Sequence, residues 1–230
     1  MTTKKRILTA ALCILALFVR ARRAGAELVL IGITGEVTMA ADWCGFLGGT
    51  VHEGDIITGT YTYDTSTPDL RPGPAAALHW YYSPPFGISL KIGELEFKTD
   101  PDNVEFYIGI EDNAMTAGLS FRDRMYIHSH NNLLTPIGAP PCYRIDLYLA
   151  SGDGTAISGG DLPSTAPVLS DWSGAGVRIE CLGAPCQARQ FAIYGVWTDA
   201  FVIPEPATLA LLGLGALALL RKRSSTQTAR

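Results

Sequence analysis

The sequence lacks the short motifs by which several large enzyme classes are recognised. It has no Gly-x-Ser-x-Gly elbow, no phosphate-binding glycine loop and no histidine motif of a zinc protease. Carboxylates are plentiful, but a glycosidase needs two of them held about 5 to 9 Å apart, and a sequence does not pair them. The chain is therefore predicted not to be an enzyme, and a glycan-active hydrolase is kept as the alternative.

Basic residues are scarce between residues 27 and 206. Eight of them stand there against all 22 acidic residues of the chain, which gives this segment a net charge near −14. The whole-chain value of −4 hides the imbalance, because the other lysines and arginines lie at the two ends. So acidic a segment excludes nucleic acid and anionic lipid as favoured partners, since their phosphates would repel it. It contains no complete calcium-ligand series such as an EF-hand loop.

Amphipathic helical periodicity is also missing from the middle of the chain. Apolar and polar residues alternate there in short β-rich runs, separated by glycine, proline, aspartate and asparagine. The runs cover residues 28–38, 55–64, 88–97, 104–110, 118–121, 125–128, 143–149, 177–181 and 191–197. This pattern predicts an all-β domain, an antiparallel β-sandwich or jelly-roll-like fold.

Two stretches without this alternation are expected to be long connections. They are the proline- and glycine-rich residues 69–77 and the longer segment 151–172. The second contains Leu162-Pro163 and Asp171-Trp172, whose apolar side chains would hold the connection against the sheet.

The first 26 residues have the three regions of a secretory signal peptide. Basic residues at 4–6 precede an apolar stretch at 7–19, which is too short to span a bilayer. Small residues at 24–26 would allow cleavage before Glu27. The sequence thus predicts export through the general secretion machinery and removal of this segment by signal peptidase.

Of the five cysteines, Cys13 lies in the signal peptide. The even number that remains is typical of two disulfides in an oxidising compartment. The favoured pairs are Cys181 with Cys186, across a short turn, and Cys44 with Cys142, across a loop whose closure stabilises by about 4 kcal/mol. A zinc site at Cys181 and Cys186 is the weaker alternative, because no second close cysteine pair or suitably spaced histidine accompanies them.

The C-terminal end combines a proline-flanked glutamate, an uncharged apolar run and a basic cluster. These are Pro204, Glu205 and Pro206, then residues 207–220, then Arg221, Lys222 and Arg223. As a transmembrane helix the run would be roughly 21 Å long, which is short for a hydrocarbon core of about 30 Å. The basic cluster would stay cytoplasmic and leave the main body outside. An ordinary tail anchor with a proline-rich joint would have a similar composition.

This order of features closely resembles the PEP-CTERM sorting signal of Gram-negative envelopes, with Val202 and Ile203 before the first proline. The resemblance implies a transient inner-membrane anchor that is processed by an exosortase, a membrane protease. It also implies delivery to the cell surface or extracellular matrix, where such proteins are associated with biofilm and extracellular polysaccharide. The expected division is a signal peptide at 1–26, a secreted domain at 27–202, the sorting signal at 203–223 and a polar tail at 224–230.

Two groups of side chains are candidates for binding. Trp80, Tyr81 and Tyr82 are candidates for stacking on sugar rings, although packing inside the fold is the favoured interpretation. Tyr61 and Tyr63 would share a strand face and extend such a platform. The leading prediction is a structural or adhesive matrix protein, and the alternative is a carbohydrate-binding module.

His128 and His130 would also share a strand face, being two residues apart. Together with His79 they have ligand types that suit a metal, but exposed histidines in a loop are the favoured interpretation. No metal or other cofactor is predicted.

Overall fold

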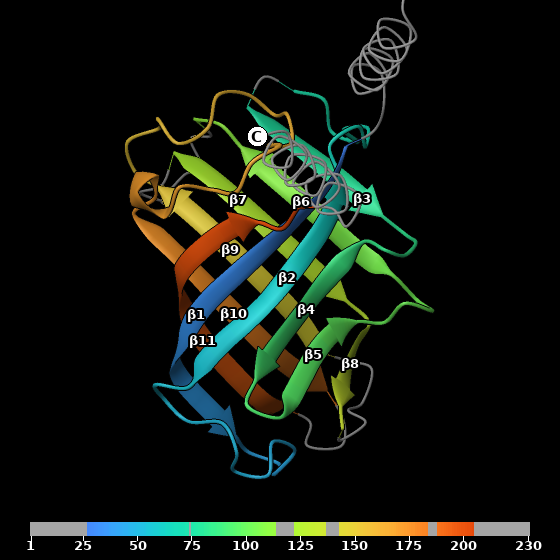
Figure 1. The fold of residues 1–230 in the computed structure, drawn as a ribbon, viewed down its shortest axis with the longest axis vertical. Coiled ribbons are helices and arrows are strands. Elements are labelled where there is room, and N and C mark those ends of the chain that lie inside the picture. The colour runs from blue at the N-terminus through green and yellow to red at the C-terminus, as the bar shows by residue number, and fades with distance from the viewer. Residues whose placement is uncertain (1–26, 74, 114–121, 137–142, 184–187, 205–230) are drawn as a thin grey trace, which may run out of the picture.

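The structure is a computed structural model that describes residues 27–73, 75–113, 122–136, 143–183 and 188–204. These residues form one antiparallel sheet, shown in Figure 1. The expected strand at 118–121, the signal peptide and the apolar run at 207–220 lie outside this part of the chain. Within it, no helix is long and apolar enough to cross a membrane.

Eleven strands and one short 3-10 turn are found in the described residues. They are β1 (Leu28–Asp42), β2 (Ile56–Asp64), β3 (Ala76–Tyr81), β4 (Gly87–Ile92), β5 (Leu95–Thr99), β6 (Glu105–Glu111), β7 (Asp123–His130), β8 (Asn132–Thr135), β9 (Tyr143–Ser151), η1 (Leu169–Asp171), β10 (Gly174–Gly183) and β11 (Ala188–Val202). Their order in the sheet is β3-β6-β7-β9-β10-β11-β1-β2-β4-β5-β8. The prediction of an all-β, antiparallel domain is confirmed.

The sheet curls so that its two halves face each other across the core. In Figure 1 the half formed by β1, β2, β4 and β5 crosses in front of the half formed by β7, β9 and β10. Side chains close the curl: the hydroxyls of Thr99 in β5 and Ser129 in β7 are 2.7 Å apart, and Ser129 donates to Asn132 Oδ1 at 2.6 Å. Closure therefore depends on a buried polar contact as well as on apolar packing.

The two separate sheets expected for a sandwich or jelly roll are not found in the described part of the chain, whose strands form one sheet. The hydrogen-bonded ladder continues without interruption through β11 and β1, the two 15-residue strands at the centre. Their pairing has register shifts between Thr34 and Gly35 and between Val37 and Met39. Such bulges bend a strand and increase its twist, so the chain turns the corner without leaving the sheet.

Strands β3 and β8 were not predicted from the sequence. The alanine- and aromatic-rich run of β3 contains no β-branched residue and no alternation of polarity. The four residues of β8 are too few to show a period. The turn between β4 and β5 lies at Gly93, where the alternation of residues 88–97 is interrupted. The φ of Gly93 is 57°, a positive value that glycine adopts without strain.

The inward face is filled by large apolar side chains, and it includes Tyr61 and Tyr63, which are fully buried. The expectation that these two tyrosines extend an exposed platform is wrong. The long connection before β10 lies over this core as predicted: Leu162 is buried, Trp172 packs against the core, and the Tyr63 hydroxyl donates to the Pro163 carbonyl at 2.6 Å.

Cys181 is a buried thiol in β10. It donates a hydrogen bond to Gln190 Oε1 at 3.2 Å, across the ladder to β11. The predicted disulfide between Cys181 and Cys186 is therefore wrong, because the Cys181 side chain is a thiol that points into the core. Cys142 and Cys186 lie outside the described residues, so the pairing of Cys44 with Cys142 stays a prediction.

Candidate functional site

The outward face of strands β3, β6, β7, β9, β10 and β11 carries aromatic and charged side chains, and we call it the aromatic–ionic face. Its members are Trp80, Tyr82, Tyr107, Tyr126, His128, His130, Arg144, Asp146, Tyr148, Arg178, Glu180 and Tyr194. One row of them is in direct register across all six strands, in the order Trp80, Tyr107, His128, Asp146, Arg178 and Tyr194. At about 4.8 Å between strands, this row is roughly 24 Å long.

The β3 end of the row is a set of stacked rings. Trp80 and Tyr82 lie nearly parallel, with ring centroids 5.8 Å apart and an interplanar angle of 12°. Tyr107 contacts Trp80 at a centroid distance of 4.5 Å and stacks on the other side against His128 at 4.8 Å. Tyr82 is 69% exposed, so the outermost ring is available to a ligand.

Tyr81 is not part of this face. Successive strand residues point to opposite sides of a sheet, so Tyr81 is directed inward while its two neighbours point outward. It is buried against Phe86 and Phe106, and its hydroxyl donates to the Asp64 carbonyl at 3.0 Å. Of the three aromatics proposed from the sequence, Trp80 and Tyr82 are therefore outward and Tyr81 belongs to the core.

Two glycines make room for further rings on the face. A Cβ atom at Gly109 would collide with the ring of Tyr126, and one at Gly176 would collide with the ring of Tyr148. Each tyrosine therefore lies across the backbone of the neighbouring strand. Aromatic rings that cover glycine in this way flatten the surface and shield the exposed ladder.

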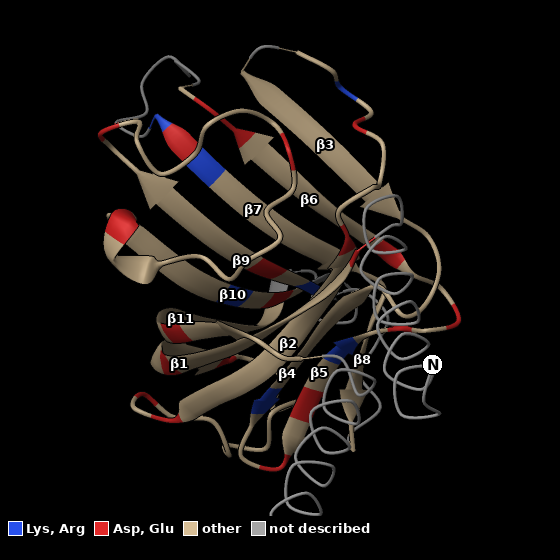
Figure 2. Cartoon of the chain, turned by 45° about the horizontal axis from the view of Figure 1, so that its top comes forward, with Lys and Arg blue, Asp and Glu red and all other residues tan. Residues whose placement is uncertain are grey.

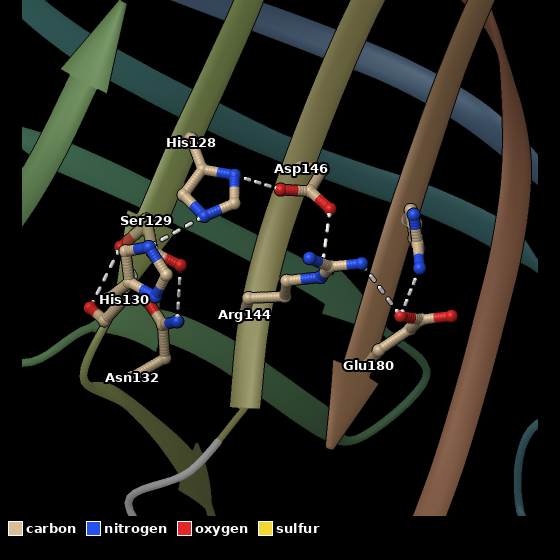
Figure 3. A network of polar contacts seen from close by, with 8 residues as sticks. His128, Ser129, His130, Asn132, Arg144, Asp146 and Glu180 are labelled. Carbon is tan, nitrogen blue, oxygen red and sulfur yellow. Dashed lines mark hydrogen bonds and ion pairs between the residues drawn. The ribbon is translucent and has the colours of Figure 1, made fainter. Parts of the chain in front are cut away.

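Charged side chains form a connected network next to the rings, shown in Figure 3. Arg144 bridges two carboxylates, with its Nε 3.2 Å from Asp146 and a terminal nitrogen 3.0 Å from Glu180. Glu180 is completely buried, and it also accepts hydrogen bonds from Arg178 and from the Tyr194 hydroxyl. Each buried charge thus has an oppositely charged or hydrogen-bonding partner, as burial of an ion requires.

The two histidines of the face are also connected to this network. Nδ1 of His128 pairs with Asp146, and its Nε2 is 2.8 Å from Nε2 of His130. Burial, followed by the neighbouring His128, lowers the pKa of His130 below its ordinary value of 6.5. A proton on His130 would lie in a partly buried site close to the neighbouring ring, so the charged form of His130 is disfavoured.

His79 does not join these two histidines, because it is directed to the other side of the sheet. Its ring nitrogens lie 2.8 Å from the Thr67 carbonyl and 3.2 Å from the Gly160 carbonyl. It therefore fastens two loops to β3. Among the residues that the structure describes, no group of three or more side chains is placed to hold a metal ion.

The outward face of the other half of the sheet has a different composition. It is covered by Thr34, Thr58, Thr60, Thr62, Ser89, Lys91, Glu96 and Lys98, which we call the threonine face. Part of it is an open depression of about 370 Å³, bordered by Thr60, Phe201 and Ile203. Figure 2 shows the few basic residues as short blue segments on several strands and on a connection.

The last strand ends where the sorting signal begins. Val202 is opposite Ile31 in the ladder, and the Ile203 amide still donates to the Leu30 carbonyl at 2.8 Å. Pro204 is exposed, and its nitrogen has no hydrogen to continue the ladder. The other residues proposed for sorting, Glu205, Pro206, Arg221, Lys222 and Arg223, lie outside the described part of the chain.

The fold and its C-terminal extension define a class of protein: an all-β domain joined directly to a processing signal. The family model of the PEP-CTERM protein-sorting motif matches residues 202–224, so the chain carries this sorting signal. Such a motif means export, transient membrane anchoring and processing by an exosortase, a membrane protease. No curated protein and no solved structure matches the chain.

Proposed function

We propose that this protein is a non-enzymatic component of the cell surface or extracellular matrix that adheres to polysaccharide through its aromatic–ionic face. The observation that carries the proposal is the nearly parallel pair of Trp80 and Tyr82, continued by Tyr107 on the outside of the sheet. Sugar rings present apolar faces that stack on aromatic rings. Hydroxyl and charged groups beside the rings supply hydrogen bonds to the sugar hydroxyls.

The shape of the face supports a polymer as ligand. Its register row crosses six strands and is roughly 24 Å long, which exceeds the length of a single sugar. A polysaccharide lying across the strands would meet the stacked rings first and the ionic network next. Biofilm or exopolysaccharide association follows from this mode of binding together with export.

A glycan-active hydrolase is less well supported by the same residues. Asp146 and Glu180 are the carboxylates nearest to the rings in the network, and Arg144 bridges them. A glycosidase carboxyl must reach the glycosidic bond, whereas Glu180 is completely buried and both carboxylates are engaged by Arg144. We therefore assign these two carboxylates to the structure of the face.

Export also supports the parts of the proposal that lie outside the described residues. A signal peptide at 1–26 would start secretion, and an oxidising compartment would allow Cys44 to pair with Cys142. Non-reducing peptide mapping of the secreted protein tests this disulfide. Alkylation of both Cys44 and Cys142 without prior reduction would contradict it.

The binding proposal is tested with the secreted protein and a panel of immobilised polysaccharides, by depletion from solution. Replacing both Trp80 and Tyr82 by alanine should weaken binding at least about tenfold, since each lost stack removes roughly 1 kcal/mol. The matched control replaces Thr58 and Thr60, on the threonine face, by alanine and should bind normally. Equal binding by both double variants, with unchanged melting temperatures, would exclude this face as the adhesive surface.

A further inference from the structure

The sorting signal of this chain has no linker in front of it. The matched motif starts at Val202, the last residue of β11, and the backbone of Ile203 is still hydrogen-bonded to β1. Most of the segment that precedes the signal is therefore part of the folded sheet at the moment when the protease acts.

The strand that leads into the signal is not easily released. β11 lies between β10 and β1 and is paired with both. Its residues Phe191, Ala192 and Ile193 are completely buried, and Trp197 donates a hydrogen bond from its indole to the Gly176 carbonyl at 3.0 Å. The β10 ladder reaches Val196, and the last residues of β11 are held by the ladder with β1 up to Val202, so extracting the whole strand would break two ladders and expose this core.

The distance to the membrane is equally restricted. Residues 204–206 separate Ile203 from the apolar run, and an extended residue spans at most about 3.6 Å. Five extended steps lead from Val202, the last residue of β11, to residue 207, so the end of β11 lies within roughly 18 Å of the start of the anchor. A membrane protease that reaches the motif must at the same time lie against this end of the sheet.

The surface at that end of the sheet carries exposed apolar side chains. Leu28 in β1 and Phe201 in β11 are 40% and 47% exposed on the outward side of the sheet. The ring of Phe201 covers Gly32, and beside it lies the depression of the threonine face that Thr60 and Ile203 border. We call Leu28, Thr60 and Phe201, which share the outward side of the sheet, the exit patch.

We propose that the exit patch is a docking surface for the exosortase, so that the protease recognises folded sheet and proline-flanked motif together. The inference rests on the processing that the motif implies and extends it from a linear signal to a three-dimensional one. The short tether selects the protease as occupant, because it is the partner that must approach this end of the sheet while the anchor is intact.

The test follows processing of the full-length chain in cells that contain the exosortase, by pulse-chase labelling and mass spectrometry. Thr60→Glu places a longer, charged side chain in the depression, where Lys91 is available as a partner. It should slow processing about tenfold, which corresponds to about 1.4 kcal/mol of docking energy. Thr38→Glu, the same change at an exposed position near the other end of β1, is the matched control and should be processed at the normal rate.

A second variant separates docking from folding. A flexible insertion of about ten glycine and serine residues between Phe201 and Val202 keeps the matched motif at 202–224 intact and leaves Leu28, Thr60 and Phe201 in place, but removes their fixed distance to the motif. Processing should become slower. Faster or unchanged processing of the insertion variant would overturn the proposal, because the sheet would then be an obstacle or irrelevant. If the parent chain is not processed at all, it is the sorting assignment that fails.

Discussion

The two outward faces of this single sheet solve the same structural problem in different ways. On the threonine face, short β-branched and polar side chains cover the ladder with few mutual contacts, such as the 3.1 Å hydrogen bond from Ser89 to Glu96. On the aromatic–ionic face, rings and ions contact one another from β3 to β11. Since short polar and charged side chains with few mutual contacts cover most of one half of the sheet, the stacked rings of the other half exceed what the fold requires.

The largest expected difference between the two faces is in the unfolding free energy that is lost when one carboxylate on each face is neutralised. Glu180→Gln leaves Arg144 and Arg178 near a neutral amide in a fully buried position, and we expect a loss of about 3 kcal/mol in unfolding free energy. Glu96→Gln, on the threonine face, should change stability by less than about 0.5 kcal/mol. Urea denaturation of both variants measures this. Losses of similar size would show that the ionic network is not a buried, coupled unit.

A smaller difference in lost stability is expected between alanine substitutions at two glycines that lie beneath aromatic rings, one on each face. In Gly109→Ala the new methyl group collides with the half-buried ring of Tyr126, and displacing it should destabilise by about 1 to 3 kcal/mol. In Gly32→Ala the methyl group meets Phe201, which is 47% exposed and can turn into solvent, so the loss should be nearer 0.5 kcal/mol.

Thermal unfolding of the two alanine variants measures the loss of stability. Near-ultraviolet circular dichroism of the tyrosines tests whether displacement of the ring is its cause. A stable Gly109→Ala protein with an unchanged aromatic spectrum would contradict the close packing of ring and backbone.

The sorting signal was predictable from the sequence because all its parts follow one another along the chain. The aromatic–ionic face was not, because it combines side chains from six strands whose register the sequence does not specify. His128 and Asp146 meet only because β7 pairs with β9 in one particular register. The hydrophobic pattern indicated most strands, but it contained no information on which strands are neighbours.

The direction of the aromatic side chains was a separate difficulty. In β3 and the residue after it, apolar or aromatic side chains occupy both sides of the strand, so alternation does not reveal which side is inward. Tyr81 and Tyr82 are indistinguishable by residue type, yet the first is 3% exposed and the second 69%. The same ambiguity concealed that Tyr61 and Tyr63 belong to the core.

The smallest expected difference between the two faces is in the pH dependence of stability, because the aromatic–ionic face carries two histidines and the threonine face carries none. Burial and His128 lower the pKa of folded His130 below 6.5, so the unfolded chain takes up this proton first as the pH falls. Stability should therefore decrease as the pH falls from about 6.5 to the folded pKa, and should not change through this group above or below that window.

His130→Gln should flatten this part of the stability profile, measured by urea denaturation between about pH 7 and 5. His52→Gln, at an exposed position in the turn before β2, is the control and should keep the parent slope. A parent profile that rises on acidification across this window would contradict the geometry of the histidine pair, since the folded state would then be the better proton acceptor.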